Sequence, residues 1–255
     1  MMDISRDETA PNASHPGPGG PARAVRRAMT IGAALNISLV VYGAIRFPSA
    51  WRAGADSVCA GIGILTVYAL IGWFGAPAAE RFDPAIVRLA LRFGAFVGGL
   101  FAISMLCEYI VPHDHQQNVL LALATFGLFF VALLVAGAVG TLDTRRLGLG
   151  VLTSVWTALI ASLCWFILLL VYYFAFLNTP QEARFLEIDQ VIADHQRHLQ
   201  KGGTQDLRAF IYNDYLGGGF FHSLLAPLLA VPLGALGGLG AKVGLWLGGC
   251  KERVE

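Results

Sequence analysis

The chain has 255 residues, of which 56% are hydrophobic and only 14% are charged, and its formal net charge is +1. This composition, with 30 glycines, is typical of helices packed in a lipid bilayer, and it excludes both a soluble globular domain and a basic surface for nucleic acid. The four cysteines show no C-x-x-C spacing, so neither a disulfide framework nor a zinc motif is indicated. We therefore expect an all-α integral membrane protein whose first partner is the lipid bilayer.

Residues 1–27 are rich in Pro, Gly, Ser and Ala, which predicts a disordered cytoplasmic tail because little apolar surface is there to offset the entropy of ordering. Residues 28–45 form the first apolar run. A secretory signal peptide cleaved near Ala53–Ala55 would explain this run, but about ten residues separate the two, so we favour an uncleaved first span. Because the run is short and contains Asn36, a protein with five spans is the alternative.

Four further apolar runs follow, at residues 57–76, 90–111, 118–140 and 151–177. The last of them is uncharged over 27 residues. As a helix it would be about 40 Å long, which exceeds a hydrocarbon core of about 30 Å. Arg145 and Arg146 precede it and aromatic residues crowd its far end, as expected for a span that starts in the cytoplasm. Residues 28–177 are thus predicted to hold transmembrane helices one to five.

The polar segment 178–218 is predicted to be an extracytoplasmic helical loop. Thr179 to Glu182 reads as a capping box, and Gly202 with Gly203 provides a stop, so one helix should lie between them. Its apolar stripe comprises Phe185, Ile188, Ile192 and Leu199. Thr204 should cap a second short helix. We expect the two amphipathic helices to form a small cap on the bundle or to lie along the outer surface; a docking site for a partner is the alternative.

Residues 219–255 are predicted to form transmembrane helix six and a short cytoplasmic tail. Small residues recur every four positions on one face of this helix, which lets two backbones approach closely in lipid. They are Ala226, Ala230, Gly234 and Gly238. Packing inside the molecule is favoured over a homo-oligomer, and the expected partners are Gly94 and Gly98 of helix three or Ala132, Ala136 and Gly140 of helix four. Pro227 and Pro232 predict a kink.

The distribution of Lys and Arg predicts the orientation. With six spans, the segments on the side of the N-terminus hold twelve of the eighteen basic residues. Basic residues concentrate on the cytoplasmic side of membrane proteins. Both termini should therefore be cytoplasmic, and the glycine-rich apolar composition favours the bacterial cytoplasmic (inner) membrane.

Residues that could bind a metal ion or transfer a proton gather at the outer end of the predicted bundle. The metal-ligand candidates are His113, His115, His195 and His198, because an H-x-H and an H-x-x-H offer imidazoles to a transition metal, the one cofactor that the sequence suggests. Glu108, near the end of a span, and His222, at the start of the last span, are the candidate proton or ion site.

No glycine-rich phosphate loop, G-x-S-x-G elbow or H-E-x-x-H motif occurs, which argues against a nucleotide-driven pump, an α/β-hydrolase and a zincin. The middle of every span lacks charged residues. We therefore favour a non-enzymatic structural or accessory subunit of a membrane complex. The alternative is a small-solute or metal-ion transporter that uses Glu108 and the outer histidines, and a membrane-embedded metal enzyme ranks third.

Overall fold

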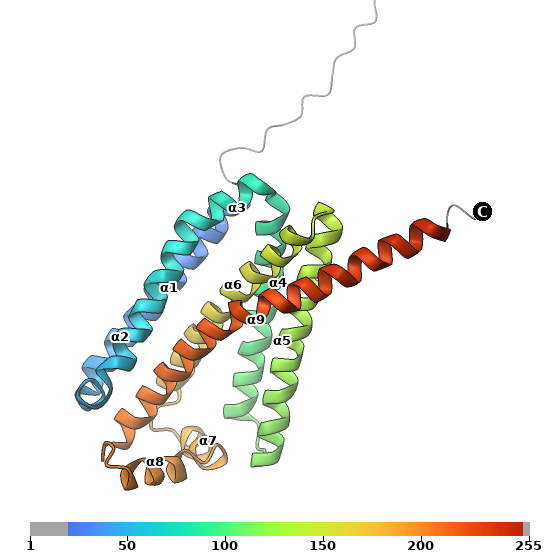
Figure 1. Ribbon diagram of the computed structural model, residues 1–255. Helices are drawn as coiled ribbons and strands as arrows, with labels where there is room; N and C mark the ends of the chain where they lie inside the picture. The colour runs from blue at the N-terminus through green and yellow to red at the C-terminus, as the bar shows by residue number, and fades with distance from the viewer. Residues whose placement is uncertain (1–19, 252–255) are drawn as a thin grey trace, which may run out of the picture.

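The computed structural model describes residues 20–251 as a helical bundle, and no strand occurs within that range (Figure 1). Its elements are α1 Pro21–Arg46, α2 Pro48–Leu70, the π-helical turn η1 Ile71–Gly75, α3 Ala76–Phe82, α4 Pro84–Ile110, α5 His115–Thr144, α6 Leu147–Ala175, α7 Pro180–Ile188, α8 Val191–Gln200 and α9 Leu207–Lys251. Most of the predicted tail lies outside the described residues. Residues 21–27 are not part of a tail, because α1 begins at Pro21, a residue suited to the first turn of a helix.

Six of the described helical segments are long and apolar enough to cross a membrane. The prediction of an all-α membrane bundle with about six spans is therefore confirmed. Helix α1 is among these six segments, although the presence of Asn36 favoured the alternative with five spans. Asn36 is fully buried, and its side-chain amide donates a hydrogen bond of 3.3 Å to the carbonyl of Leu163 in α6. A neighbouring backbone thus binds the amide nitrogen of this polar residue, while its buried Oδ1 atom has no hydrogen-bond partner among the described residues.

Helix α6 is the central element of the bundle, since α1, α4, α5 and α9 all pack against it. Phe166, Leu170 and Tyr173 on α6 are almost completely buried. Figure 1 shows α1 and α2 on one side of α6 and α4 and α5 on the other, with α9 running diagonally across them. Both ends of the described chain lie opposite α7 and α8, which form the cap predicted from the sequence.

Small residues allow α9 to approach α5 and α6 closely. A Cβ atom added to Gly137 of α5 would lie 2.6 Å from the Cα atom of Gly234, so the two backbones are in direct contact. Ala226 and Ala230 are buried in a cluster with residues of α5 and α6. The small-residue face of α9 thus lies against these two helices. Gly94 and Gly98 of α4, expected as its partners, instead contact Ile160 and Cys164 of α6.

The cap differs from the sequence prediction in its helix boundaries. The single helix expected between Thr179 and Gly202 is broken at Gln190, whose φ of 57° is left-handed. The break rotates α8 relative to α7. As a result Ile192 and Leu199 leave the predicted apolar stripe and are 41% and 39% exposed, while Val191 and His195 are buried.

The second short helix of the cap is the first part of α9. Helix α9 runs without interruption from Leu207, so the predicted boundary at residue 219 falls inside it. Asp206, not Thr204, caps this helix, because its side chain accepts hydrogen bonds from the backbone N–H groups of Arg208 at 2.9 Å and Ala209 at 3.2 Å.

Candidate functional site

A buried ion pair joins the cap to the bundle. Glu182 at the start of α7 is only 3% exposed and forms an ion pair with Arg208 of α9. Its second carboxylate oxygen accepts a hydrogen bond of 2.6 Å from the N–H of Asn178, and Arg208 also donates to the Asn178 side chain. Thr179 caps α7 as predicted, but the Glu182 side chain binds Asn178 and Arg208 instead of closing the capping box. These bonds fix α7 to the first turn of α9.

A stack of aromatic rings and two further hydrogen bonds attach the cap to α4 and α5. The ring of Tyr109 stacks on Phe176 and Phe185 with centroid distances of 4.6 and 4.7 Å. Arg184 donates a hydrogen bond of 2.5 Å to the carbonyl of Tyr109, and the His115 ring bonds to the carbonyl of Ile188 at 2.8 Å. The cap is therefore held by three helices of the bundle.

The four predicted metal ligands do not come together. His113 bonds to the Val111 carbonyl in the turn before α5, and the His115 ring is occupied by the cap. His195 and His198 on α8 both bind the backbone of Thr204, at 3.0 and 3.1 Å. Between residues 20 and 251, no group of three or more His, Cys, Asp or Glu side chains is arranged to hold a metal ion. Each of these imidazoles makes a hydrogen bond to a backbone group in a turn or at a helix end.

Glu108 and His222, the candidate proton or ion site, occupy different environments. Ser104 lies 3.4 Å from the Glu108 carboxylate and accepts a hydrogen bond of 2.8 Å from Thr125 of α5. His222 bonds to a carbonyl of its own helix and packs on Trp165, with ring centroids 4.6 Å apart. The hydroxyl groups of Ser104 and Thr125 extend the polar chain from Glu108 into the bundle; they were not predicted as part of the site, although hydroxyl residues within two apolar spans are visible in the sequence.

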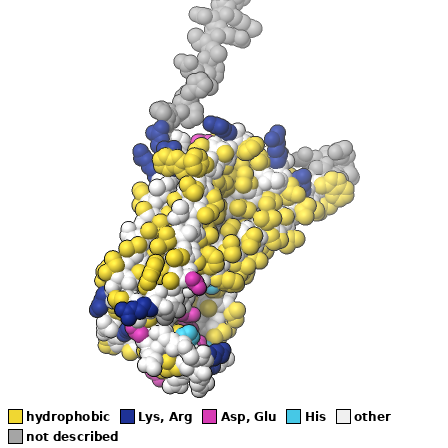
Figure 2. Space-filling view, turned by 60° about the vertical axis from the view of Figure 1, so that its left-hand side comes forward, with side chains coloured by type: hydrophobic (Ala, Val, Ile, Leu, Met, Phe, Trp, Pro, Cys, Tyr) yellow, Lys and Arg dark blue, Asp and Glu magenta, His cyan; other side chains and the backbone are white. Residues whose placement is uncertain are grey.

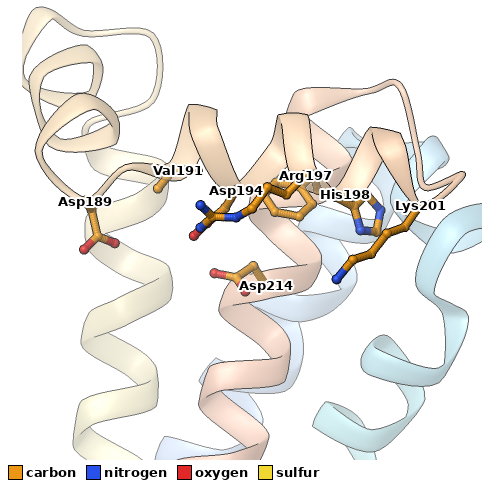
Figure 3. A pocket seen from close by; sticks show the side chains of 8 residues that line it. Asp189, Val191, Asp194, Arg197, His198, Lys201 and Asp214 are labelled. Atoms are coloured by element: carbon orange, nitrogen blue, oxygen red, sulfur yellow. The ribbon is translucent and has the colours of Figure 1, made fainter.

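A charged pocket of about 320 Å³ lies between α8 and α9 (Figure 3). Four of its lining residues follow helical spacing along α8, and Asp214 faces them from α9. The four are Asp194, Arg197, His198 and Lys201. Val191 and Phe210 add an apolar wall, and Asp189 stands at one end. The sequence predicted a cap of amphipathic helices and did not single out this pocket; the helical spacing of the four residues could have marked them as one surface.

The charges in this pocket are only partly paired. Asp194 and Arg197 form an ion pair one turn apart on α8. Among the described residues, no ion pair is made by Asp189, Asp214 or Lys201. The pKa of the Asp189 carboxyl lies above its ordinary value because the cap withdraws it partly from water and because Asp214 repels a second negative charge, an effect that His115 opposes. The pocket therefore has uncompensated charges of both signs.

The end of α9 forms a second candidate surface. Gly238 is the last glycine of the described part of α9 at which an added Cβ atom would meet the bundle, namely Leu147 and Thr141. We call residues 239–247 the free segment. Its apolar side chains are exposed: Leu239 by 49%, Val243 by 56%, Leu245 by 39%, Trp246 by 69% and Leu247 by 56%. Added Cβ atoms at Gly240 and Gly244 would have no neighbour within 4 Å.

The distribution of side chains agrees with the helical bundle. On the face that it presents, Figure 2 shows a broad hydrophobic band over the described part of the molecule, with Lys and Arg side chains gathered at its two ends. Comparison with protein-family models, with curated proteins and with solved structures finds no match for this chain. Six apolar helices and this band define the chain as a polytopic α-helical integral membrane protein.

Proposed function

We propose that the protein is a non-enzymatic subunit of a membrane complex and that its free segment packs against a transmembrane helix of another membrane protein. The observation that carries this proposal is the path of α9. The helix has 45 residues and is about 68 Å long; residues 219–247, beyond its cap portion, measure about 44 Å and still exceed a hydrocarbon core of about 30 Å. Such a helix must tilt strongly, and Figure 1 shows its end extending beyond the other helices.

The composition of the free segment supports a helix as the occupant. Within the bundle, Gly234 of the same helix makes a close backbone contact with Gly137. Gly240 and Gly244 repeat the spacing of four residues on a different face, where nothing covers them. Van der Waals packing drives helix association in lipid, and glycines at this spacing provide it by letting backbones approach. Lipid tails make no comparable close contact at these glycines, so lipid alone gives no reason for their spacing.

The orientation belongs to the same proposal. The excess of Lys and Arg on the side of the chain ends supports cytoplasmic termini in a bacterial inner membrane, with the cap outside. A reporter enzyme that is active only in the cytoplasm should be active when fused after residue 255 and inactive when inserted after Gly202, in the turn that follows α8. A reporter that is active only outside the cytoplasm should give the reverse result. The opposite pattern would contradict this orientation.

The test of the proposal changes the glycines of the free segment to leucine. Gly240→Leu with Gly244→Leu should release the partner, since two large side chains block the close approach. The matched control is Gly99→Leu with Gly127→Leu, because these glycines of α4 and α5 also have no neighbour within 4 Å. The measurements are the mass of the detergent-solubilised native complex and the identity of the chains in it.

Loss of the partner only in the free-segment variant would support the proposal. A wild-type protein of monomer mass, or equal loss in both variants, would contradict it. A mass of two copies that falls to one in the free-segment variant would replace the partner protein with a homodimer.

Small-solute transport is the second candidate function, and the polar chain from Thr125 through Ser104 to Glu108 favours it. Ionisable groups within spans commonly mark solute or proton paths. Proteoliposomes should then take up protons or solute with wild-type protein and not with Glu108→Gln, while the exposed cap variant Glu187→Gln stays active. The metal-ion version predicts bound metal in elemental analysis that is lost on His113→Ala with His115→Ala.

A further inference from the structure

The pocket between α8 and α9 lies at the level where the cap meets the spans. Asp214 is two turns into α9, and α8 covers it from the cap side (Figure 3). Its volume of about 320 Å³ is within the range of small-ligand sites. In a bilayer this position corresponds to the headgroup region, so the pocket can be reached both from water and from the membrane.

One part of the pocket suits a primary ammonium group. Asp189, at the end of α7, and Asp214 of α9 both line the pocket, so two carboxylates border the same space. Partial withdrawal from water and, second, the negative charge of Asp214 raise the pKa of Asp189. An ammonium group placed between them would offset the repulsion between the two negative charges and would donate N–H groups to both carboxylates. Phe210 and Val191 provide apolar contact for a short carbon chain beside it.

The other part of the pocket suits a phosphate group. Figure 3 shows Lys201 at the end opposite Asp189, with Arg197 between them on the same face of α8. Arg197 uses one terminal nitrogen in its bond to Asp194, so its remaining N–H groups can donate to a ligand. A phosphate offers several oxygens that can accept from a lysine and an arginine together.

We propose that this pocket binds a zwitterion with a primary ammonium and a phosphate group, the chemistry of phosphoethanolamine. The ammonium group lies between Asp189 and Asp214, and the phosphate contacts Lys201 and Arg197. The same chemistry occurs in a free phosphoethanolamine molecule and in the headgroup of an ethanolamine phospholipid. This binding does not depend on a partner at the free segment.

The experiment uses the full chain. Isothermal titration calorimetry in detergent measures binding of O-phosphoethanolamine, and native mass spectrometry from nanodiscs measures retention of ethanolamine phospholipid against choline phospholipid. Asp214→Asn and Lys201→Gln should each weaken binding of the soluble probe, the lipid or both by about three- to tenfold, since each removes one charged partner. Both residues line an open pocket, so the variants should unfold at the wild-type temperature. The control is Glu187→Gln, an exposed cap residue that does not line the pocket.

Binding of the soluble probe, weakened in the two pocket variants and not in the control, would establish the site for a free ligand. Retention of ethanolamine phospholipid over choline phospholipid, without binding of the soluble probe, would assign the site to the lipid headgroup. Binding of neither form, or wild-type affinity in both pocket variants, would overturn the proposal.

Discussion

Replacing Glu182 with glutamine should weaken the attachment of the cap to the bundle. The variant keeps the size of the side chain and removes the charge that binds Arg208 and the N–H of Asn178. The Glu182 side chain on the cap side is only 5% exposed, whereas that of Arg208 on α9 is 30% exposed, so the pair is only partly protected from water. The remaining Arg208 charge would be left half-buried without its partner.

The size of the effect follows from these contacts. Removing one partner of a fully buried ion pair costs about 3–5 kcal/mol. An exposed pair is worth at most about 1 kcal/mol. The intermediate exposure of Arg208 and the additional bond of 2.6 Å to Asn178 place Glu182→Gln at about 2 kcal/mol.

Two measurements check this expectation. SDS-induced unfolding in mixed micelles reports the free energy of unfolding, and hydrogen exchange reports local opening of residues 178–200. The matched control is Glu187→Gln on the same helix, which should change the free energy by less than about 0.5 kcal/mol. Equal effects of the two variants, or a double-mutant cycle with Arg208→Gln that shows no coupling, would refute the assigned role of the pair.

Three further variants test other parts of the fold. Gly234→Leu should destabilise the protein by about 2 kcal/mol or more in the same unfolding assay, because its backbone touches α5 and α6. Tyr212→Phe should cost about 1 kcal/mol through loss of the 2.5 Å hydrogen bond to the Val40 carbonyl. The hydrogen bond from Ser49 holds the pKa of the exposed Asp206 below its ordinary value, so the carboxylate stabilises the fold above about pH 4 and this contribution is lost as the pH falls through the lower folded-state pKa. Asp206→Asn should therefore cost about 0.5 kcal/mol at pH 7, and this difference from the wild type should vanish in acid unfolding curves.

The spans could be predicted because each is an apolar run long enough to cross a bilayer, and lipid leaves the backbone little choice except a helix. The cap boundaries could not be predicted in the same way. Gln190 adopts a left-handed conformation that its residue type does not demand, and one such residue rotates α8 and exposes Ile192. The continuation of the cap helix into α9 was not predicted, because the change from a polar to an apolar sequence near residue 219 was taken as the boundary, whereas the glycines there are tolerated inside a helix packed in lipid.

The candidate site was predicted from residue types, and types alone do not show which partners are near. His195 and His198 resemble metal ligands in the sequence, yet the backbone of Thr204 occupies one ring nitrogen of each. The pocket depends on Asp214, which lies in a separate helix from the charges of α8 and faces them only in the folded chain. The number of residues between Asp214 and the charges of α8 does not indicate that they line the same pocket.

Helix α9 connects the two proposed sites, since Asp214 lines the pocket near its start and the free segment is its end. A ligand in the pocket changes the affinity for a partner only if α9 has two arrangements that the two sites bias differently. The contact between Gly234 and Gly137 lies between the sites and joins backbone to backbone, so sliding of α9 would drive main-chain atoms into one another. Side chains can change rotamer to accommodate a shift, whereas backbones in contact cannot. We therefore infer that the pocket and the free segment act independently, with the glycine contact as the fixed point between them.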